Sequence, residues 1–130
     1  MKKVLVVLVL ALSVLTLQAG PLSPGAVSAV KYNNIEKNLF MGMDSNNDGL
    51  KFSSIYRLGE IKSYKAVIPL LSILKNNESE SMRIISALSL YKIGDERGLF
   101  AIKQASKFDE SERVRRMCTI FYNEFLSTQQ

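Results

Sequence analysis

Residues 82–90 read MRIISALSL, and two similar stretches lie 32 positions before and after them. These are LKFSSIYRL at residues 50–58 and VRRMCTIFY at residues 114–122. In each stretch the first residue is apolar, the second is basic and the fifth is small, and the alignment needs no gap. Self-similarity at a fixed period of about 20 to 50 residues is typical of proteins built from stacked repeats. The period therefore predicts such a stack.

Each repeat has the pattern of two amphipathic helices joined by a polar turn. In the middle repeat, apolar residues recur at helical spacing over 66–74, residues 76–80 are polar, and 81–93 is again periodic. No stretch alternates between apolar and polar residues as a strand would. We therefore expect an all-α fold, an α-solenoid of about three helix pairs with a period of 32. The expected units are 33–64, 65–96 and 97–126 of a repeat domain over 33–126, followed by a tail over 127–130.

Two positions of the repeat are predicted to have structural roles. At one position every unit has a basic side chain, which we expect to pair with turn groups of its own or of the adjacent unit. The alternative is a basic row that binds an anionic partner. At the other position every unit has a small side chain, which fits where neighbouring helices approach closely. The basic residues are Lys51, Arg83 and Arg115, and the small residues are Ser54, Ser86 and Cys118.

The N-terminal residues have the pattern of a secretory signal peptide. Lys2 and Lys3 precede an apolar run over 4–17, and small residues at Ala19 and Gly20 provide a cleavage site. A run of 14 residues is shorter than the roughly 20 needed to span a bilayer as a helix. We therefore expect a cleaved signal over 1–19 and an exported protein, periplasmic or secreted, with no stable membrane span. An uncleaved N-terminal helix that tethers the protein to the envelope is the alternative.

Residues 20–32 are expected to form a flexible leader, because Pro21, Pro24 and Gly25 break regular structure.

The composition excludes several classes of function. The 130 residues contain no histidine and one cysteine, which rules out Ser-His-Asp and Cys-His catalysis, histidine metal sites and an intrachain disulfide. The loop over 44–49 imitates the start of a calcium-binding loop, but the closing glutamate is missing. Loss of Lys2 and Lys3 lowers the net charge from +5 to +3, too little for a nucleic-acid binder. We expect no enzyme activity, no cofactor, no metal and no nucleic-acid partner.

Three segments resemble a known family of helical repeats. They are AVIPLL at 66–71, LYKIGD at 90–95 and SERVR at 111–115. These segments resemble HEAT repeats, and more narrowly the short subclass first recognised in phycobilisome lyases. The first unit departs from the pattern, with Lys62 and Ser63 where Gly-Asp is expected. The resemblance implies stacked helix pairs, and it implies little about function because such repeats serve many roles.

In such stacks the second helices usually line the binding face, and aromatic and arginine side chains are favoured interface anchors. The predicted partner contacts are Tyr56, Arg57, Ser89, Tyr91, Phe121 and Phe125. The aromatics at the C-terminal end are expected either to pack onto the preceding unit or to mediate self-association. The sequence thus predicts a non-catalytic exported scaffold that binds another protein. The alternative from the family resemblance is a lyase-like or chromophore-handling protein.

Overall fold

The structure, a computed structural model, describes residues 23–130, so the predicted signal segment and residues 20–22 lie outside it. Within the described range all regular structure is helical and no strand is present, which confirms the predicted all-α class. The elements are α2 (Pro24–Met43), α3 (Asp48–Glu60), the short 3-10 helix η1 (Tyr64–Ala66), α4 (Val67–Asn76), α5 (Glu80–Ile93), α6 (Glu96–Phe108) and α7 (Glu112–Ser127).

The chain divides into two units, residues Met1–Lys31 and Tyr32–Gln130. In the described part of the first unit, residues 24–31 are helical, whereas the sequence predicted an irregular leader there. The reason is that Pro24 occupies the first helical position, where its missing N–H leaves no hydrogen bond unmade. The hydroxyl of Ser23 accepts a hydrogen bond from the Ala26 N–H and so caps the helix.

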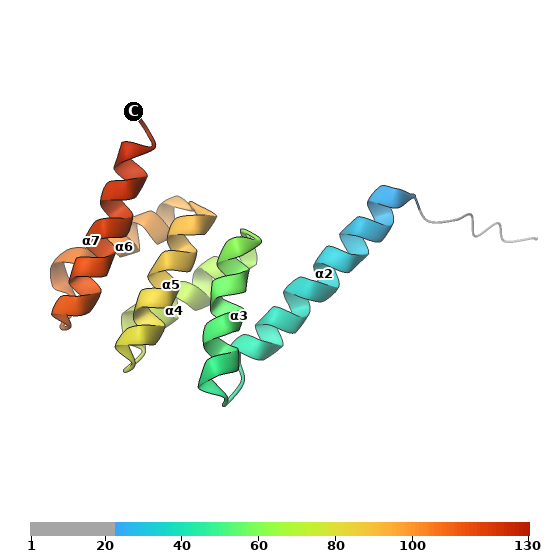
Figure 1. Ribbon diagram of the computed structural model, residues 1–130, viewed down its shortest axis with the longest axis horizontal. Coiled ribbons are helices and arrows are strands. Elements are labelled where there is room, and N and C mark those ends of the chain that lie inside the picture. The colour runs from blue at the N-terminus through green and yellow to red at the C-terminus, as the bar shows by residue number, and fades with distance from the viewer. Residues whose placement is uncertain (1–22) are drawn as a thin grey trace, which may run out of the picture. The chain divides into compact units, whose positions relative to one another are not determined.

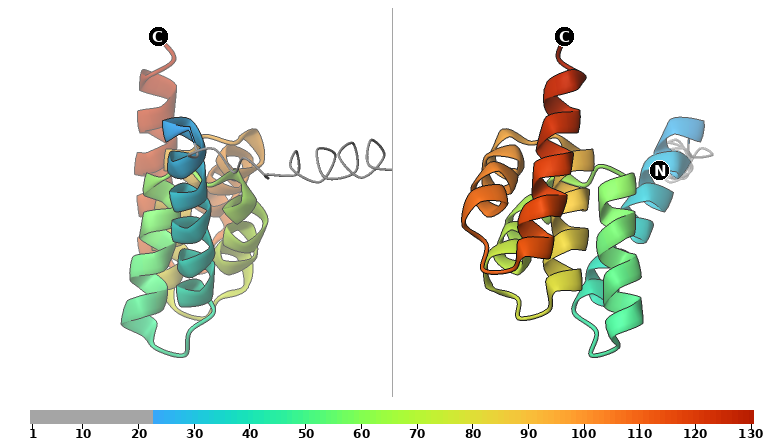
Figure 2. Two further views of the ribbon diagram at one scale, coloured as in Figure 1. Left: turned by 90° about the vertical axis from the view of Figure 1, so that its right-hand side faces the viewer. Right: turned by 60° about the vertical axis from the view of Figure 1, so that its left-hand side comes forward.

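In chain order we refer to α2–α3, α4–α5 and α6–α7 as the first, middle and last helix pairs. Within the second unit α4 packs on α5, and α6 packs on α7. Helices α3, α5 and α7 lie side by side in one layer, and α4 and α6 lie behind them (Figure 1). The second view in Figure 2 shows the same order of α3, α5 and α7 across the layer. We call the contact of α3 with the α4–α5 pair the first junction, and the contact of α5 with the α6–α7 pair the second junction.

The three turns that precede α3, α5 and α7 have the same hydrogen bonds at intervals of 32 residues. The N-cap side chains accept from the backbone N–H three residues on, and the side chain two residues before each N-cap accepts from the N-cap N–H. The N-cap bonds join Asn47 to Leu50, Ser79 to Met82, and Ser111 to Val114. The preceding bonds join Ser45 to Asn47, Asn77 to Ser79, and Asp109 to Ser111. The 32-residue register is therefore present in the local backbone.

The core lies between the two layers. Its fully buried side chains include Ile55, Leu58, Leu70, Leu90 and Ile102. The repeat positions predicted to be small, Ser54, Ser86 and Cys118, are all buried in this core. The first of the apolar set behaves differently: Leu50 is half exposed, whereas Met82 and Val114 are buried. The difference follows from position, because Leu50 belongs to the first helix pair, which has no pair before it within the repeat domain.

Candidate functional site

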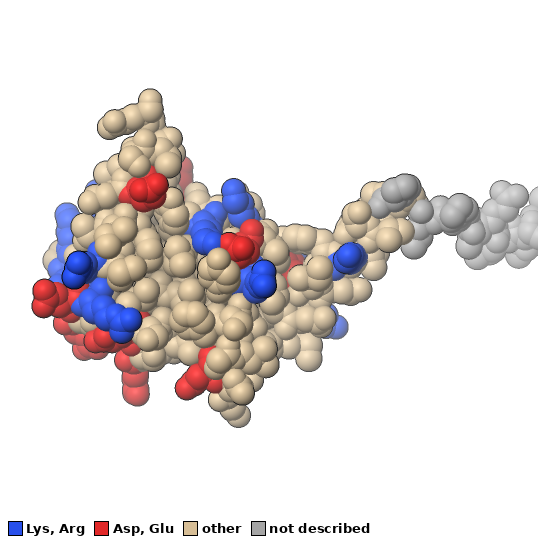
Figure 3. Space-filling model, in the orientation of Figure 1, with Lys and Arg blue, Asp and Glu red and all other residues tan. Residues whose placement is uncertain are grey.

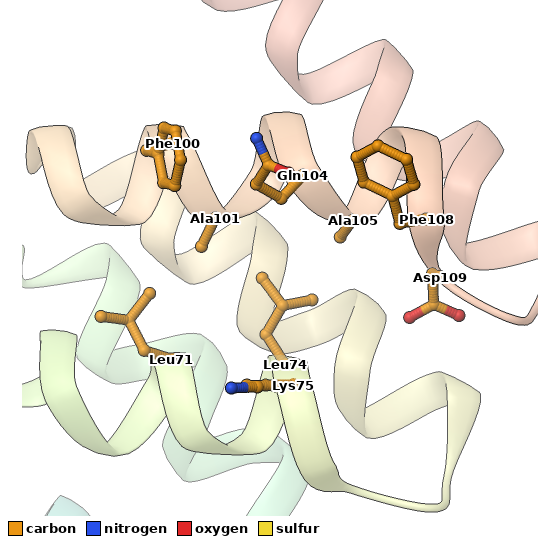
Figure 4. Close-up of a pocket in the computed structure, with 9 residues that line it drawn as sticks. All are labelled: Leu71, Leu74, Lys75, Phe100, Ala101, Gln104, Ala105, Phe108 and Asp109. Atoms are coloured by element: carbon orange, nitrogen blue, oxygen red, sulfur yellow. The ribbon is translucent and has the colours of Figure 1, made fainter.

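A groove of about 540 Å³ lies between α4 and α6 (Figure 4). Leu71 and Leu74 point into it from α4, and Ala101 and Ala105 face them from α6. The two alanines are four residues apart, so they occupy one face of α6 and leave the space between the helices unfilled. The floor of the groove is apolar.

Aromatic side chains form the rim of this groove on the α6 side. Phe100 and Phe108 are 64% and 75% exposed, and Gln104 lies between them. The two phenylalanine rings thus extend the apolar surface of the groove into solvent. Lys75 and Asp109 lie at one end of the groove and are its only charged lining residues within the described part of the chain. The arrangement suits an apolar side chain or segment more than a charged ligand.

Asp109 is engaged by Arg83 across the second junction. The Arg83 Nε donates to Asp109 Oδ2 at 3.0 Å and Nη2 donates to Oδ1 at 2.9 Å, which is a bidentate pair. The Nη1 group donates to the backbone oxygens of Asn77 and Glu78 in the turn before α5. The two side chains are 4% and 8% exposed, so this is a buried ion pair, and Asp109 holds the pKa of Arg83 above its usual value.

Arg115 repeats the backbone half of this arrangement. Its Nη1 donates to the backbone oxygens of Asp109 and Glu110, the residues 32 positions after Asn77 and Glu78. It makes no ion pair within residues 23–130. In the first helix pair the equivalent residue is Lys51, which lines a small cleft with Asn77 but forms no hydrogen bond to it. We call the three basic repeat residues Lys51, Arg83 and Arg115 the basic ladder. Within residues 23–130, Arg83 is the member of this ladder that forms an ion pair with a carboxylate.

The outer face of α3, α5 and α7 holds part of the predicted contact set. Tyr56 is half buried, and Lys92 lies over its ring, 4.3 Å from the centroid, while also pairing with Glu60. This hydrogen bond from Lys92 holds the pKa of Glu60 below its usual value. Arg57 is exposed, and uncharged surface extends across this face (Figure 3). Of these two residues Arg57 is open to solvent, whereas the Tyr56 ring is covered by Lys92 and packs against the core.

Two other predicted contacts are buried and cannot act as a free surface. The hydroxyl of Ser89 donates to the Ile55 backbone oxygen at 2.9 Å, inside the first junction. Phe121 is 9% exposed and stacks on Tyr91, with ring centroids 6.2 Å apart, inside the second junction. Phe125 is half buried and packs against the core. The sequence placed Ser89 and Phe121 on the surface because a period shows which residues are equivalent and not which way they face.

The described residues offer no support for a catalytic or metal site. Burial raises the pKa of the Cys118 thiol to about 12, which leaves it without a thiolate at neutral pH. No group of three His, Cys, Asp or Glu side chains in residues 23–130 could hold a metal ion. In the loop that imitates a calcium site, Ser45 and Asn47 serve as caps. The same range contains no helix with the length and apolar character needed to cross a membrane.

A comparison with known protein families finds no match, and no curated protein is detectably similar. The resemblance to HEAT repeats therefore rests on the residues of this chain alone.

Sequence reasoning missed the α4–α6 groove. One signal could have indicated it: Phe108 stands at the repeat position where the middle unit has Asn76. An aromatic residue at the polar end of a helix is a candidate contact, because burying it within the fold is not possible there. The hollow itself depends on which face of α6 meets α4, and the period alone does not give that.

Proposed function

We propose that the protein is a non-catalytic scaffold of three stacked HEAT-like helix pairs that binds an apolar segment of another protein in the α4–α6 groove. The observation that carries the proposal is the pair of exposed rings, Phe100 and Phe108, beside a floor of leucine and alanine. An amphipathic helix placed in such a groove would cover both rings and bury its own apolar face. The pattern of residues 1–19 supports a location outside the cytoplasm, in the periplasm or the medium.

The absence of histidine and the protonated Cys118 support a binding role over catalysis. A small chromophore is a second candidate occupant, because the groove volume of about 540 Å³ falls in the range of small-molecule sites. Such sites normally enclose most of their ligand, however, and here the rim residues are largely exposed. The open rim favours a protein segment.

The test is photo-crosslinking in the native compartment with a benzophenone side chain at Gln104, inside the groove. Ser72 provides a matched control, because it holds the same repeat position on α4, is exposed and lies outside the groove. We expect a discrete cross-linked protein from position 104 and none from position 72. Adding Phe100→Ser should abolish the product.

Equal products from both positions, or a product that persists in the Phe100→Ser background, would refute the groove as the binding site. Native mass spectrometry of the purified protein separates the chromophore alternative, which requires a bound small mass. N-terminal sequencing separates the cleaved from the tethered form, since a start at Gly20 indicates cleavage and an intact Met1 indicates tethering.

A further inference from the structure

Within the basic ladder, the contacts made by Arg83 show which group Arg115 can bind. Arg83 and Arg115 each donate to two backbone oxygens in the turn before their own helix. The two oxygens bound by Arg115 lie 32 residues after the two bound by Arg83. Arg83 then uses Nε and Nη2 for the carboxylate of Asp109, which the next helix pair supplies. The Nε and Nη2 groups of Arg115 make no ion pair and no hydrogen bond within residues 23–130. These two donors have the geometry to bind a carboxylate as Arg83 does.

The surface around Arg115 differs from the two junctions in chemistry. Three apolar residues of the middle repeat, Leu71, Ala87 and Leu90, are replaced in the last repeat by Lys103, Thr119 and Tyr122. Two further positions are basic in both repeats, as Lys75 and Arg83 and as Lys107 and Arg115. We call this surface the end face; it consists of Lys103, Lys107, Arg115, Thr119 and Tyr122.

The end face carries a positive charge and lies apart from the groove. Lys103 Nζ lies 5.7 Å from the centroid of the Tyr122 ring, which places it beside α7. Figure 3 shows blue atoms together with red atoms at the edge of the molecule formed by α6 and α7. Two exposed carboxylates, Glu110 and Glu112, lie close to Arg115 in the sequence, and Glu110 Oε1 is 3.6 Å from Arg83 Nη2. The end face itself, through its lysines and Arg115, complements a negatively charged partner.

We propose that the end face docks an acidic turn of another protein, whose aspartate binds Arg115 in the way that Asp109 binds Arg83. The recognised element is an Asp-x-Ser turn, since Asp109 accepts from the Ser111 N–H while it binds Arg83. Lys103 and Lys107 contribute longer-range attraction. This site is independent of the α4–α6 groove.

A second copy of the chain is a poorer occupant than a different protein. In head-to-tail stacking, the first helix pair would bring Ser45 to the place of Asp109, because those residues share one repeat position. Serine has no charge to offer Arg115. The polar residues of the end face also lack the apolar area that a stable dimer between copies requires.

The probe is a capped peptide of residues 105–113, ASKFDESER, which carries the turn that Arg83 binds within the chain. Titration into the ¹⁵N-labelled protein should give saturable shifts at Arg115, Thr119 and Lys103. The same peptide with Asp109→Asn should bind at least about tenfold more weakly, since a hydrogen bond to a charged group is lost. Added salt should weaken binding further.

Two protein variants complete the test. Arg115→Lys keeps the charge but loses the planar fork, so binding should fall about tenfold while folding is preserved. Arg113→Met is the matched control, because Arg113 is an exposed arginine of α7 outside the ladder. The proposal is overturned if the peptide shows no saturable shifts, if the two variants weaken binding equally, or if the shifts appear at Phe100 and Phe108 instead. Sedimentation of the unliganded protein as a dimer would also overturn it in favour of self-association.

Discussion

The two junctions join helices that are equivalent in the repeat, but side chains of very different size fill them. At the first junction Gly59 lies against Ser89, so closely that a Cβ on Gly59 would stand 2.7 Å from the Ser89 Cα. At the second junction the same two repeat positions hold Tyr91 and Phe121, whose rings stack. One junction is filled by backbone contact and the other by two aromatic rings. A common period thus fixes the register of the helices and leaves the packing of each junction to local residues.

The polar contacts between neighbouring helix pairs also differ between the two junctions. The second junction is crossed by the buried Arg83–Asp109 pair. At the first junction, Lys51 and Asn77 hold those two repeat positions and do not bond. The first helix pair is instead tied to η1 by Glu36, which accepts from the Ser63 hydroxyl at 2.6 Å and pairs with Lys65. The following predictions test whether each junction depends on its own residues.

The largest effect is expected from Arg83→Met. It leaves the Asp109 carboxylate buried without its partner, and breaking such a pair lowers the free energy of unfolding by about 3 to 5 kcal/mol. Urea denaturation measures the loss. The control is Arg115→Met, which removes two backbone hydrogen bonds but no ion pair and should lower stability far less. Equal losses in the two variants would mean that the carboxylate pair adds nothing.

Gly59→Ala should come next, with a loss of about 1 to 3 kcal/mol, because the new methyl group meets the backbone of Ser89 and forces α3 and α5 apart. Thermal denaturation of the variant measures this. Gly25→Ala is the control, since a Cβ at Gly25 meets nothing within 4 Å. A variant at Gly59 as stable as the control would show that the close approach is not a constraint.

Glu36→Gln is expected to change the response of stability to acid. Hydrogen bonds from Lys65 and Ser63 hold the pKa of Glu36 below its usual value. Its contribution to stability is therefore complete above the ordinary carboxyl pKa and is lost as the pH falls through the lowered pKa. Between about pH 6 and pH 3 the native protein should lose more stability than the variant. Parallel denaturation curves across that range would exclude a role for this carboxylate.

A gain in stability is expected when the Arg83–Asp109 ion pair of the second junction is introduced at the equivalent positions of the first junction. Lys51→Arg with Asn77→Asp should raise the free energy of unfolding by about 1 kcal/mol, through a new hydrogen-bonded ion pair. Each single variant should do little, so the coupling energy of a double-mutant cycle is the measurement. Additive effects of the two changes would show that the side chains at the first junction cannot reach each other.

The smallest effect concerns the turns that end α3 and α5. Lys62 and Gly94 hold the same repeat position and both have positive φ, 52° and 76°. Lys62→Gly removes the strain of a side chain in that region and should stabilise the protein by about 0.5 to 1 kcal/mol. Gly94→Ala should destabilise the protein by a similar amount. The added Cβ meets no atom within 4 Å, so the loss comes from backbone strain at positive φ alone. Opposite signs in calorimetry are the expected result.

The sequence predicted the helices and their register well, for a physical reason. Capping residues and apolar spacing act locally, so Ser79 and Ser111 begin their helices as their positions in the repeat predict. The irregular leader was wrong from Pro24 on, because proline breaks helix interiors and favours helix starts. The candidate partner contacts were harder to predict from the sequence. Ser89 faces a neighbouring helix, while Arg57, at the same repeat position, faces solvent. Which side of a helix is covered depends on partners distant in sequence.

Helix α5 presents Ser89 to the helix before it and Tyr91 to the helix after it. It therefore acts as an adapter between two unlike neighbours, and whole repeats are not interchangeable parts of this molecule. Excision of residues 65–96 would preserve the period, yet it would set the ring of Phe121 against Gly59, where only a hydroxymethyl group now fits. The packing of each junction is therefore specific to its own pair of helices.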